Sequence, residues 1–224
     1  MKKLLIANWK QNKNLSEIKS WFDSFAGKYK ANDNVNVAIS PSLAYLSDVF
    51  NLIEKYGLSN VFVSAQDVSE FPGGAHTGEV SAFQVKDFCR YSIVGHSERR
   101  ESFDKVLLKV ENCLSLGVMP ILCLRSPRDF RKDFDERIVL VWEDPLNISG
   151  ESYKETPPDA VAEAISKIRE VIGSRDLLYG GSVNEKNIDQ LLDKDFGLTG
   201  FLVGQASLSP DSFVFLHNSI VKSL

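Results

Sequence analysis

Short apolar runs rich in strand-forming residues recur along the whole chain and predict eight strands. They cover residues Leu4–Asn8, Val35–Ser40, Val61–Ala65, Tyr91–Val94, Pro120–Cys123, Ile138–Trp142, Leu177–Tyr179 and Gly200–Val203. Because these runs are almost continuously apolar, they are typical of parallel strands that are buried on both faces of a sheet.

The stretches between these runs show helical periodicity. One helix is predicted from the steps of three and four residues that join Ala160, Ala164, Ile168, Val171 and Ile172. Strand and helix therefore alternate, and 224 residues divided among eight units give 28 each, close to the smallest βαβ repeat. We predict an α/β fold, a closed (β/α)8 barrel. An open, doubly wound sheet is the alternative, because periodicity does not show closure.

A second helix follows from Leu107, Val110 and Leu114, which lie along one face. The chain is 43% hydrophobic and contains no Gly/Ser-rich linker or charge block, so residues 1–224 are expected to form a single domain. A balance of 26 basic and 30 acidic residues gives a net charge of −4. This charge argues against binding to nucleic acid or to an anionic membrane.

The first residues and the cysteines restrict the compartment. The apolar run Leu4 to Ala7 is too short for the core of a signal peptide or for a membrane span, so a cytoplasmic location is expected. Cys89, Cys113 and Cys123 are odd in number and far apart, which argues against disulfide pairing and against a zinc site. Buried free thiols are the expected state.

Candidate chemistry lies at the strand ends, because α/β folds bind ligands at the carboxyl edge of their strands. Asn8 ends the first run and Lys10 follows it two positions later, so the two share one side of an extended chain. A helix cap and a solvated lysine would explain the same residues. His96 lies in a dense polar cluster after the fourth run, where a neutral imidazole beside a helix N-terminus can donate to a carbonyl oxygen. A buried structural histidine is the alternative.

The sixth, seventh and eighth runs end in a carboxylate and in two glycine turns. Partial burial of Glu143 would raise its pKa and make it a usable base, whereas Asp144 is the expected solvent-facing neighbour. Gly180-Gly181-Ser182 and Gly204-Gln205 offer backbone N–H groups to an anion. The segment from Pro145 to Gly150 would serve as a lid over the site.

Five motifs occur in one order from Asn8 to about Leu208 and together resemble triosephosphate isomerase. They are ANWKQN at 7 to 12, AQDVSEFPGGAHTGEVS at 65 to 81, VGHSERRE at 94 to 101, YGGSV at 179 to 183 and GFLVGQASL at 200 to 208. The resemblance implies a TIM barrel that interconverts dihydroxyacetone phosphate and D-glyceraldehyde 3-phosphate in glycolysis and gluconeogenesis. It implies no metal and no other cofactor.

The resemblance also implies a role for each strand-end residue. Asn8 and Lys10 would contact the substrate and stabilise negative charge, His96 would polarise the carbonyl, and Glu143 would move the proton. Glu98 would organise Lys10. The phosphate group would be held by backbone N–H groups, namely those of Ser149, Ser182, Gly204 and Gln205.

Several residues depart from the family pattern. Asp144 stands where the family has proline, Ser149 where the lid has glycine, and Gln205 where the second phosphate-binding glycine lies. Glu143 remains the predicted base, because its spacing to Ile148 is that of the family. The short stretch from Cys123 to Glu143 predicts a short or irregular fifth helix.

The loop from Glu70 to Glu79 resembles the family's intersubunit arm, which implies a homodimer in which the loop docks beside the neighbour's Lys10. Because the fifth-helix region is short, a tetramer is an alternative to the dimer that the sequence does not exclude. His76 is expected at the surface or the interface, and His217 in a structural position. Two other functions remain open: isomerisation of a longer sugar phosphate such as a tetrulose phosphate, and binding by a barrel that is no longer an efficient enzyme.

Overall fold

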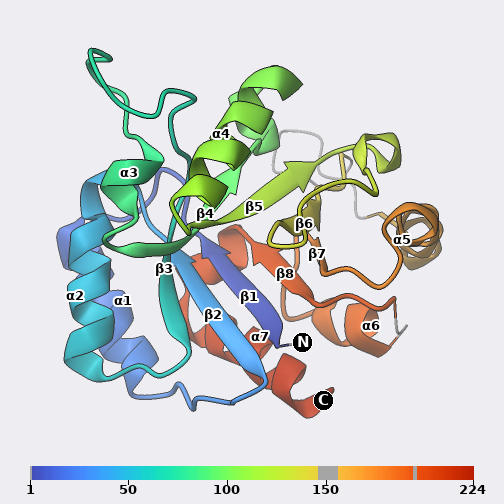
Figure 1. Ribbon diagram of the computed structural model, residues 1–224. Helices are drawn as coiled ribbons and strands as arrows, with labels where there is room; N and C mark the ends of the chain where they lie inside the picture. Colours follow the sequence, from blue (N-terminus) through green and yellow to red (C-terminus); the bar gives the residue numbers. More distant parts are fainter. Residues whose placement is uncertain (1, 146–155, 194–195) are drawn as a thin grey trace.

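Eight parallel strands close into a barrel in the computed structural model, which describes residues 2–145, 156–193 and 196–224 (Figure 1). Each strand pairs with the next in chain order, and β8 pairs with β1. The strands are β1 Lys3–Asn8, β2 Val35–Ser40, β3 Val61–Ala65, β4 Cys89–Val94, β5 Met119–Leu124, β6 Val139–Trp142, β7 Leu177–Tyr179 and β8 Gly200–Val203. All eight predicted runs are strands, and closure excludes the open sheet.

Helices cover the outside of the barrel. The α-helices of the described chain are α1 Leu15–Ala26, α2 Leu46–Tyr56, α3 Ala82–Val85, α4 Phe103–Ser115, α5 Pro158–Ile172, α6 Ile188–Asp193 and α7 Pro210–Lys222. Short 3-10 helices are η1 Leu43–Tyr45, η2 Ser97–Arg99, η3 Pro127–Asp129 and η4 Gln205–Leu208. Asn14, and not Asn8, caps α1, in a capping box with Glu17.

The connection from β5 to β6 contains η3 and no α-helix, which confirms the expected short or irregular fifth helix. Phe130 and Phe134 of this connection are buried and cover the strands in place of a helix. The guanidinium group of Arg175 donates to the carbonyl oxygens of Phe134 and Asp135, both at 2.6 Å, and thereby ties the connection to the start of β7.

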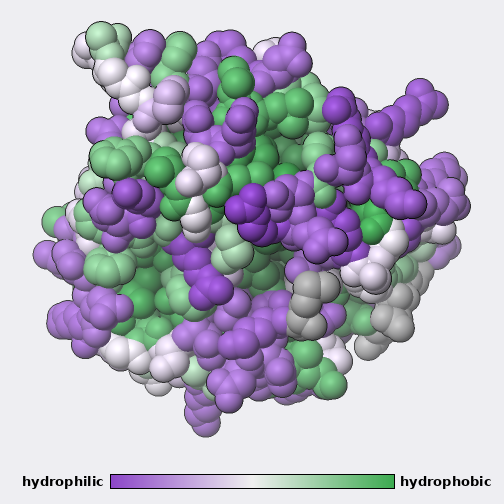
Figure 2. Space-filling view, viewed as in Figure 1, coloured by the Kyte–Doolittle hydropathy of each residue, from purple (hydrophilic) through white to green (hydrophobic). Residues whose placement is uncertain are grey.

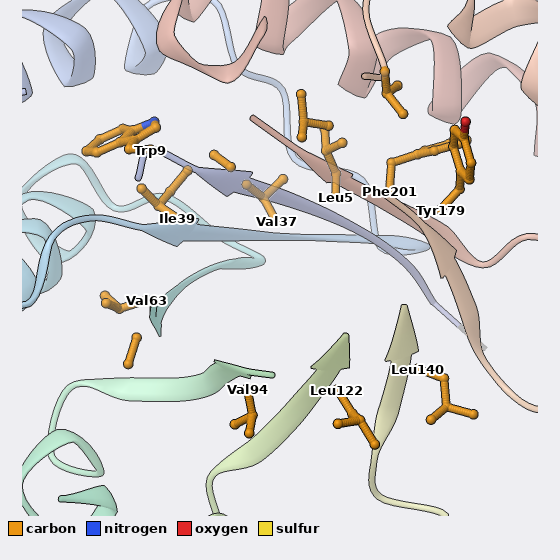
Figure 3. Close-up of a cluster of buried hydrophobic side chains, with 14 of the residues drawn as sticks. Leu5, Trp9, Val37, Ile39, Val63, Val94, Leu122, Leu140, Tyr179 and Phe201 are labelled. Atoms are coloured by element: carbon orange, nitrogen blue, oxygen red, sulfur yellow. The ribbon is translucent and has the colours of Figure 1, made fainter. Parts of the chain in front are cut away.

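Two apolar layers explain why the strands read as continuous hydrophobic runs. One layer lies between strands and helices, and Figure 3 shows Leu5, Val37 and Phe201 in it. The other fills the barrel interior with alternate residues of the strands, among them Leu4, Ile6, Ala38, Ile93, Ile121, Val141, Leu178 and Leu202. The same alternation, continued past the strand ends, places Asn8, Glu143, Gly180 and Gly204 on the interior side.

The buried faces of α4 and α5 differ in detail from the predicted ones. Helix α5 buries Val161, Ile165, Ile168 and Ile172, whereas Ala160 is exposed. Helix α4 buries Val110 as predicted, but Leu107 and Leu114 are half-buried. The charged side chain of Lys109 occupies the buried face in their place. Periodicity identified both helices and misplaced their faces by about one residue, because apolar residues flank the true stripe on both sides.

All three cysteines are free and buried, as expected. Burial raises the pKa of the thiols of Cys89 and Cys113 to about 12, which keeps both protonated near neutral pH.

On the face shown in Figure 2, polar and apolar residues alternate, and apolar residues gather beside α3 and α4. Phe83, Phe88 and Leu108 are exposed apolar residues of this region. Residues 71–79 are exposed and form a loop that extends away from the barrel (Figure 1). None of the described helices is long and apolar enough to cross a membrane.

Candidate active site

The polar residues predicted from the strand ends converge at the carboxyl end of the barrel. A cavity of about 370 Å³ opens there. The ends of β1 to β4 line it with Asn8, Lys10, Gln11, Ser42, Leu43, Gln66, Asp67, His96, Glu98 and Arg99. This edge is where parallel α/β folds bind ligands. The fold therefore brings the predicted site residues of β1 and β4, namely Asn8, Lys10, His96 and Glu98, into one cavity.

Lys10 is held in an unusual backbone conformation. Its φ of 51° lies in the left-handed region, which disfavours residues with a side chain. The side-chain oxygen of Asn8 accepts from the Lys10 N–H at 3.1 Å, and the Gln66 amide donates to the Lys10 carbonyl at 2.8 Å and to the Ser40 carbonyl at 2.9 Å. Such a conformation persists where its surroundings fix it. Asn8 and Gln66 are those surroundings.

The Lys10 ammonium lies between two other predicted residues. Its Nζ donates to Glu98 Oε1 at 2.6 Å. A Cβ added to Gly204 would lie 3.6 Å from Lys10 Cε and 3.9 Å from Nζ, so the turn after β8 approaches the lysine closely. A positive charge therefore stands beside the glycine turn that was predicted to hold an anion.

His96 and Glu143 are in direct contact. His96 Nε2 lies 3.1 Å from Glu143 Oε1, and Ser97 donates its N–H to Oε2 at 2.8 Å and its hydroxyl to Oε1 at 3.1 Å. His96 Nδ1 accepts from the Glu98 N–H at 3.3 Å, at the start of η2. With Nδ1 an acceptor, the imidazole is neutral and carries its proton on Nε2, where it points at Glu143.

Glu143 is enclosed by the barrel. Only 2% of the residue is exposed, and its N–H donates to the Leu124 carbonyl at 2.9 Å, one position past the end of β6. The nearby thiol of Cys123 stays protonated, because burial raises its pKa well above the usual value and the charge of Glu143 adds to this. A buried carboxylate on the interior side of the barrel suits proton transfer to and from a bound substrate.

The prediction that Asp144 faces solvent is wrong. Asp144 is also 2% exposed, and its Oδ2 accepts from the Tyr179 hydroxyl at 3.2 Å. Alternation along the strand puts Asp144 on the side opposite Glu143, within the layer between strands and helices. The two neighbouring carboxylates therefore occupy different compartments of the fold.

The turns after β7 and β8 close the other half of the site. A Cβ on Gly180 would contact Val141, Glu143 and Leu202 at 3.2 to 3.6 Å, so this turn passes directly beside the carboxylate. Ser182 has a φ of 50°, and its carbonyl accepts from Asn184 and Asn187 at 2.9 and 3.2 Å.

The second turn leads into η4. Gly204 precedes this short helix, and Gln205 is its exposed first residue. Ser149, Ile148 and the rest of the predicted lid from residue 146 onwards lie outside the described residues.

Among the residues not assigned to the site from the sequence, Gln66, Ser97 and Tyr179 make direct hydrogen bonds to Lys10, Glu143 and Asp144. Gln66 follows β3 directly, and the strand-end rule that selected Asn8 applies equally to it. Ser97 lies within the cluster at 94 to 101, next to His96. The sequence predicts Tyr179 only as a residue of a strand, and nothing in it indicates the contact with Asp144.

A buried ionic cluster supports the loop that carries His96. Lys109 is 2% exposed, and its ammonium contacts Asp67 at 2.7 Å and Glu101 at 2.5 Å. Arg99 adds a contact to Asp67 at 2.9 Å. Burial raises the pKa of Asp67, and the adjacent Lys109 opposes that shift. The cluster joins α4, Asp67 beyond the end of β3, and Arg99 and Glu101 in the second half of the loop.

Comparison with known proteins gives consistent results. The profile of a family described as triosephosphate isomerase matches residues 3–143 and 132–220. The triosephosphate isomerase of Mycoplasmopsis pulmonis (strain UAB CTIP) is 35% identical over 246 aligned residues, which cover 95% of this chain and 96% of the relative. Those of Dehalococcoides mccartyi (strain CBDB1) and Mesomycoplasma hyopneumoniae (strain 232) are 33% and 32% identical, with 95% or more of both chains covered. The chain therefore belongs to the triosephosphate isomerase family.

Proposed function

We propose that this protein is a triosephosphate isomerase that interconverts dihydroxyacetone phosphate and D-glyceraldehyde 3-phosphate. The observation that carries the proposal is the meeting of a buried carboxylate, a neutral imidazole and a lysine ammonium at one end of the barrel. His96 Nε2 lies 3.1 Å from Glu143 Oε1, and Lys10 and His96 line the same cavity. This set matches what proton transfer beside a carbonyl group requires.

The reaction moves one proton between adjacent carbons. Glu143 removes a proton from the carbon beside the substrate carbonyl, and the electron pair moves onto the carbonyl oxygen to give an enediolate. The protonated Glu143 then returns a proton to the former carbonyl carbon. The hydroxyl proton of the first carbon passes to the former carbonyl oxygen, so the carbonyl group changes place and no oxidant or reductant is needed. Burial of Glu143 keeps water away from the intermediate.

His96 and Lys10 stabilise the negative charge that develops. The Nε2–H of His96 is the donor that would turn from Glu143 to a substrate oxygen. Lys10 adds a positive charge near the same oxygens, and Glu98 fixes the position of its ammonium through the 2.6 Å contact. Asn8 holds the Lys10 backbone and completes the polar wall.

The substrate phosphate would lie at the two glycine turns. Backbone N–H groups of Ser182, Gly204 and Gln205 are the proposed donors, and Lys10 beside Gly204 supplies the countercharge. Ser149 remains a predicted fourth donor. Every proposed step uses groups of this chain and involves no metal or organic cofactor.

A coupled assay with the purified protein tests the activity. Glu143→Gln preserves the size of the side chain and removes its basicity, so kcat should fall by about 10²- to 10⁴-fold. Full activity in Glu143→Gln, or no turnover by the wild-type protein, would show that the mechanism is wrong. Comparison of kcat/KM on three- and four-carbon sugar phosphates separates triose from tetrulose phosphate as the substrate.

The family also suggests the assembly and the location. We propose a cytoplasmic homodimer of a glycolytic enzyme, in which the exposed loop from Glu70 to Glu79 docks beside the neighbour's Lys10. The loop already has a defined shape, because the rings of Phe71 and His76 stack at 3.7 Å between centroids. A preformed projecting loop is what such an interface needs.

A further inference from the structure

A second buried carboxylate directly follows the proposed base. Asp144 lies in the layer between strands and helices. Trp142, two residues earlier in the chain, and Tyr179, its hydrogen-bond partner, both belong to the apolar cluster of this layer. An ionisable side chain in such a layer is unfavourable unless hydrogen bonds compensate for its lost hydration. The position of Asp144 therefore calls for a function beyond packing.

The contact between Asp144 and Tyr179 extends the pairing of β6 and β7. Trp142 and Tyr179 form the last residue pair of the two strands, and the Gly180 N–H donates to the Trp142 carbonyl at 2.9 Å. The Tyr179 hydroxyl then donates to Asp144 Oδ2 at 3.2 Å, beyond the end of the ladder. Figure 3 shows the ring of Tyr179 in the outer layer, with its hydroxyl oxygen at the far end.

The glycine turn after β7 is shaped around this tyrosine. A Cβ on Gly181 would lie 2.1 Å from the Tyr179 hydroxyl oxygen and 2.3 Å from Cζ, so a side chain at this position would displace the Tyr179 ring. Gly181 does not have a positive φ, so the close approach of the Tyr179 ring, and not the backbone conformation, favours glycine here. Gly180, one residue earlier, passes beside the Glu143 side chain.

We infer that Asp144 is a positioning residue, which acts through Tyr179 to fix the turn Gly180–Ser182 relative to Glu143. Asp144 is bonded to the base through the main chain, and Tyr179 is bonded to the turn in the same way. Their hydrogen bond therefore sets the separation between the group that takes the proton and the group that holds the phosphate. This inference rests on the proposed function, because it assigns those roles to Glu143 and to the turn.

The test uses Asp144→Ala, Asp144→Asn, Tyr179→Phe and the double variant Asp144→Ala/Tyr179→Phe in the full-length protein. We expect Asp144→Ala and Tyr179→Phe each to lower kcat by about 10- to 100-fold, because a displacement of about 1 Å has effects of this size. The double variant should lose about as much as either single variant, since both remove the same hydrogen bond. Asp144→Asn keeps an acceptor and should stay within about threefold of wild type.

The inhibition constant of inorganic phosphate measures whether the turn still binds phosphate. It therefore distinguishes a displaced turn from a turn that has lost its structure. It should stay within about twofold of wild type in all variants, because the turn keeps its own backbone. A rise in this constant that parallels the loss of kcat would overturn the inference, as would multiplicative effects in the double variant. Tyr29→Phe is the matched control: Tyr29 donates to the Ser59 carbonyl at 3.0 Å and packs on His217, away from the site.

Two outcomes distinguish this inference from the proposed function. A wild-type protein without triose phosphate turnover overturns the proposed function. A wild-type protein with turnover, together with unchanged kcat in Asp144→Ala and Tyr179→Phe, overturns the positioning role alone. Should Asp144→Ala fail to fold, Tyr179→Phe decides the matter, because it removes one oxygen atom and retains the ring.

Discussion

At the scale of single residues, neighbours in the chain acquire different chemistry from the side of the strand on which they lie. Glu143 is buried on the interior side, in contact with His96 and Ser97. Asp144 is equally buried on the opposite side, in contact with Tyr179. Both are acidic residues at the end of the same strand, and the alternation of the strand assigns one to the cavity and the other to the scaffold.

The length of the Glu143 side chain is expected to matter as much as its charge. In Glu143→Asp the carboxylate is retained but withdrawn by one methylene, away from His96 Nε2. We expect kcat to fall by about 10²-fold, since an error of about 1 Å in the reacting geometry has that effect, while KM changes little. Steady-state kinetics measures this. A kcat close to that of the wild type would show that another group is the base.

At the scale of elements, helix α4 carries a lysine on its buried face. Lys109 is compensated by Asp67 and Glu101, which belong to other segments of the chain. The hydrophobic pattern of the helix could not reveal this, because the partners are 42 and 8 residues away and the pattern treats lysine as a surface residue. For the same reason the predicted buried face of α4 was displaced.

Removal of the Lys109 charge should destabilise the protein strongly. Lys109→Met keeps most of the side-chain volume but removes the buried cation of Asp67 and Glu101, which then have only the exposed Arg99 as a partner among the described residues, so we expect a loss of about 3–5 kcal/mol. Urea unfolding monitored by circular dichroism measures the change. Lys105→Met is the control on the same helix: Lys105 pairs with Glu70 at the surface, and its removal should change the unfolding midpoint little. Equal effects of the two substitutions would contradict the role given to the cluster.

The burial of His217, where α7 packs beside the end of α1, should make the free energy of unfolding depend on pH. His217 on α7 is 1% exposed, and neither ring nitrogen has a hydrogen-bond partner among the described residues. Its ring lies 4.9 Å from that of Tyr29, which follows α1. Burial lowers the pKa of His217 below its usual 6.5, and the neighbouring Asn218 opposes this only in part.

The unfolded chain therefore takes up the histidine proton first as the pH falls. The free energy of unfolding should decrease below about pH 6.5, until the pH reaches the lowered pKa of the folded state. Thermal unfolding at several pH values between about 7.5 and 5.5 measures this decrease. In His217→Phe the ring contact is kept and the proton site is lost, so the decrease should be smaller. An identical pH dependence in the variant would exclude His217 as its source.

At the scale of the whole molecule, the sequence predicted the barrel well because burial on both faces makes each strand visible as an apolar run. Four of the eight strands begin and end where predicted, and the others differ by one or two residues at one or both ends. The strand-end rule also selected Asn8, Lys10, His96 and Glu143, which the barrel brings to one edge. Contacts between side chains of different strands, such as Tyr179 with Asp144, have no signature in the sequence.

The assembly gives a prediction at the same scale. Replacement of residues 72–78 by a short Gly/Ser linker should yield a monomer, because it removes the loop that projects from the barrel. We expect kcat to fall as well, since the neighbour's loop would no longer support Lys10. Sedimentation velocity and kinetics on the same samples test this. A variant that stays dimeric would place the interface elsewhere, and a fully active monomer would remove the loop from the catalytic unit.

The closed ladder of strand pairs has a consequence for how this protein can change. Register in β6 decides which of two adjacent acids enters the cavity, since Leu140, Val141 and Trp142 are each paired with a fixed residue of β7. A slip by one residue would exchange the sides of Glu143 and Asp144. An insertion or deletion of one residue within this strand would therefore turn Glu143 away from the cavity and place Asp144 there instead. We therefore expect changes of length to be tolerated in the loops, such as the connection between β5 and β6, which contains only the short helix η3.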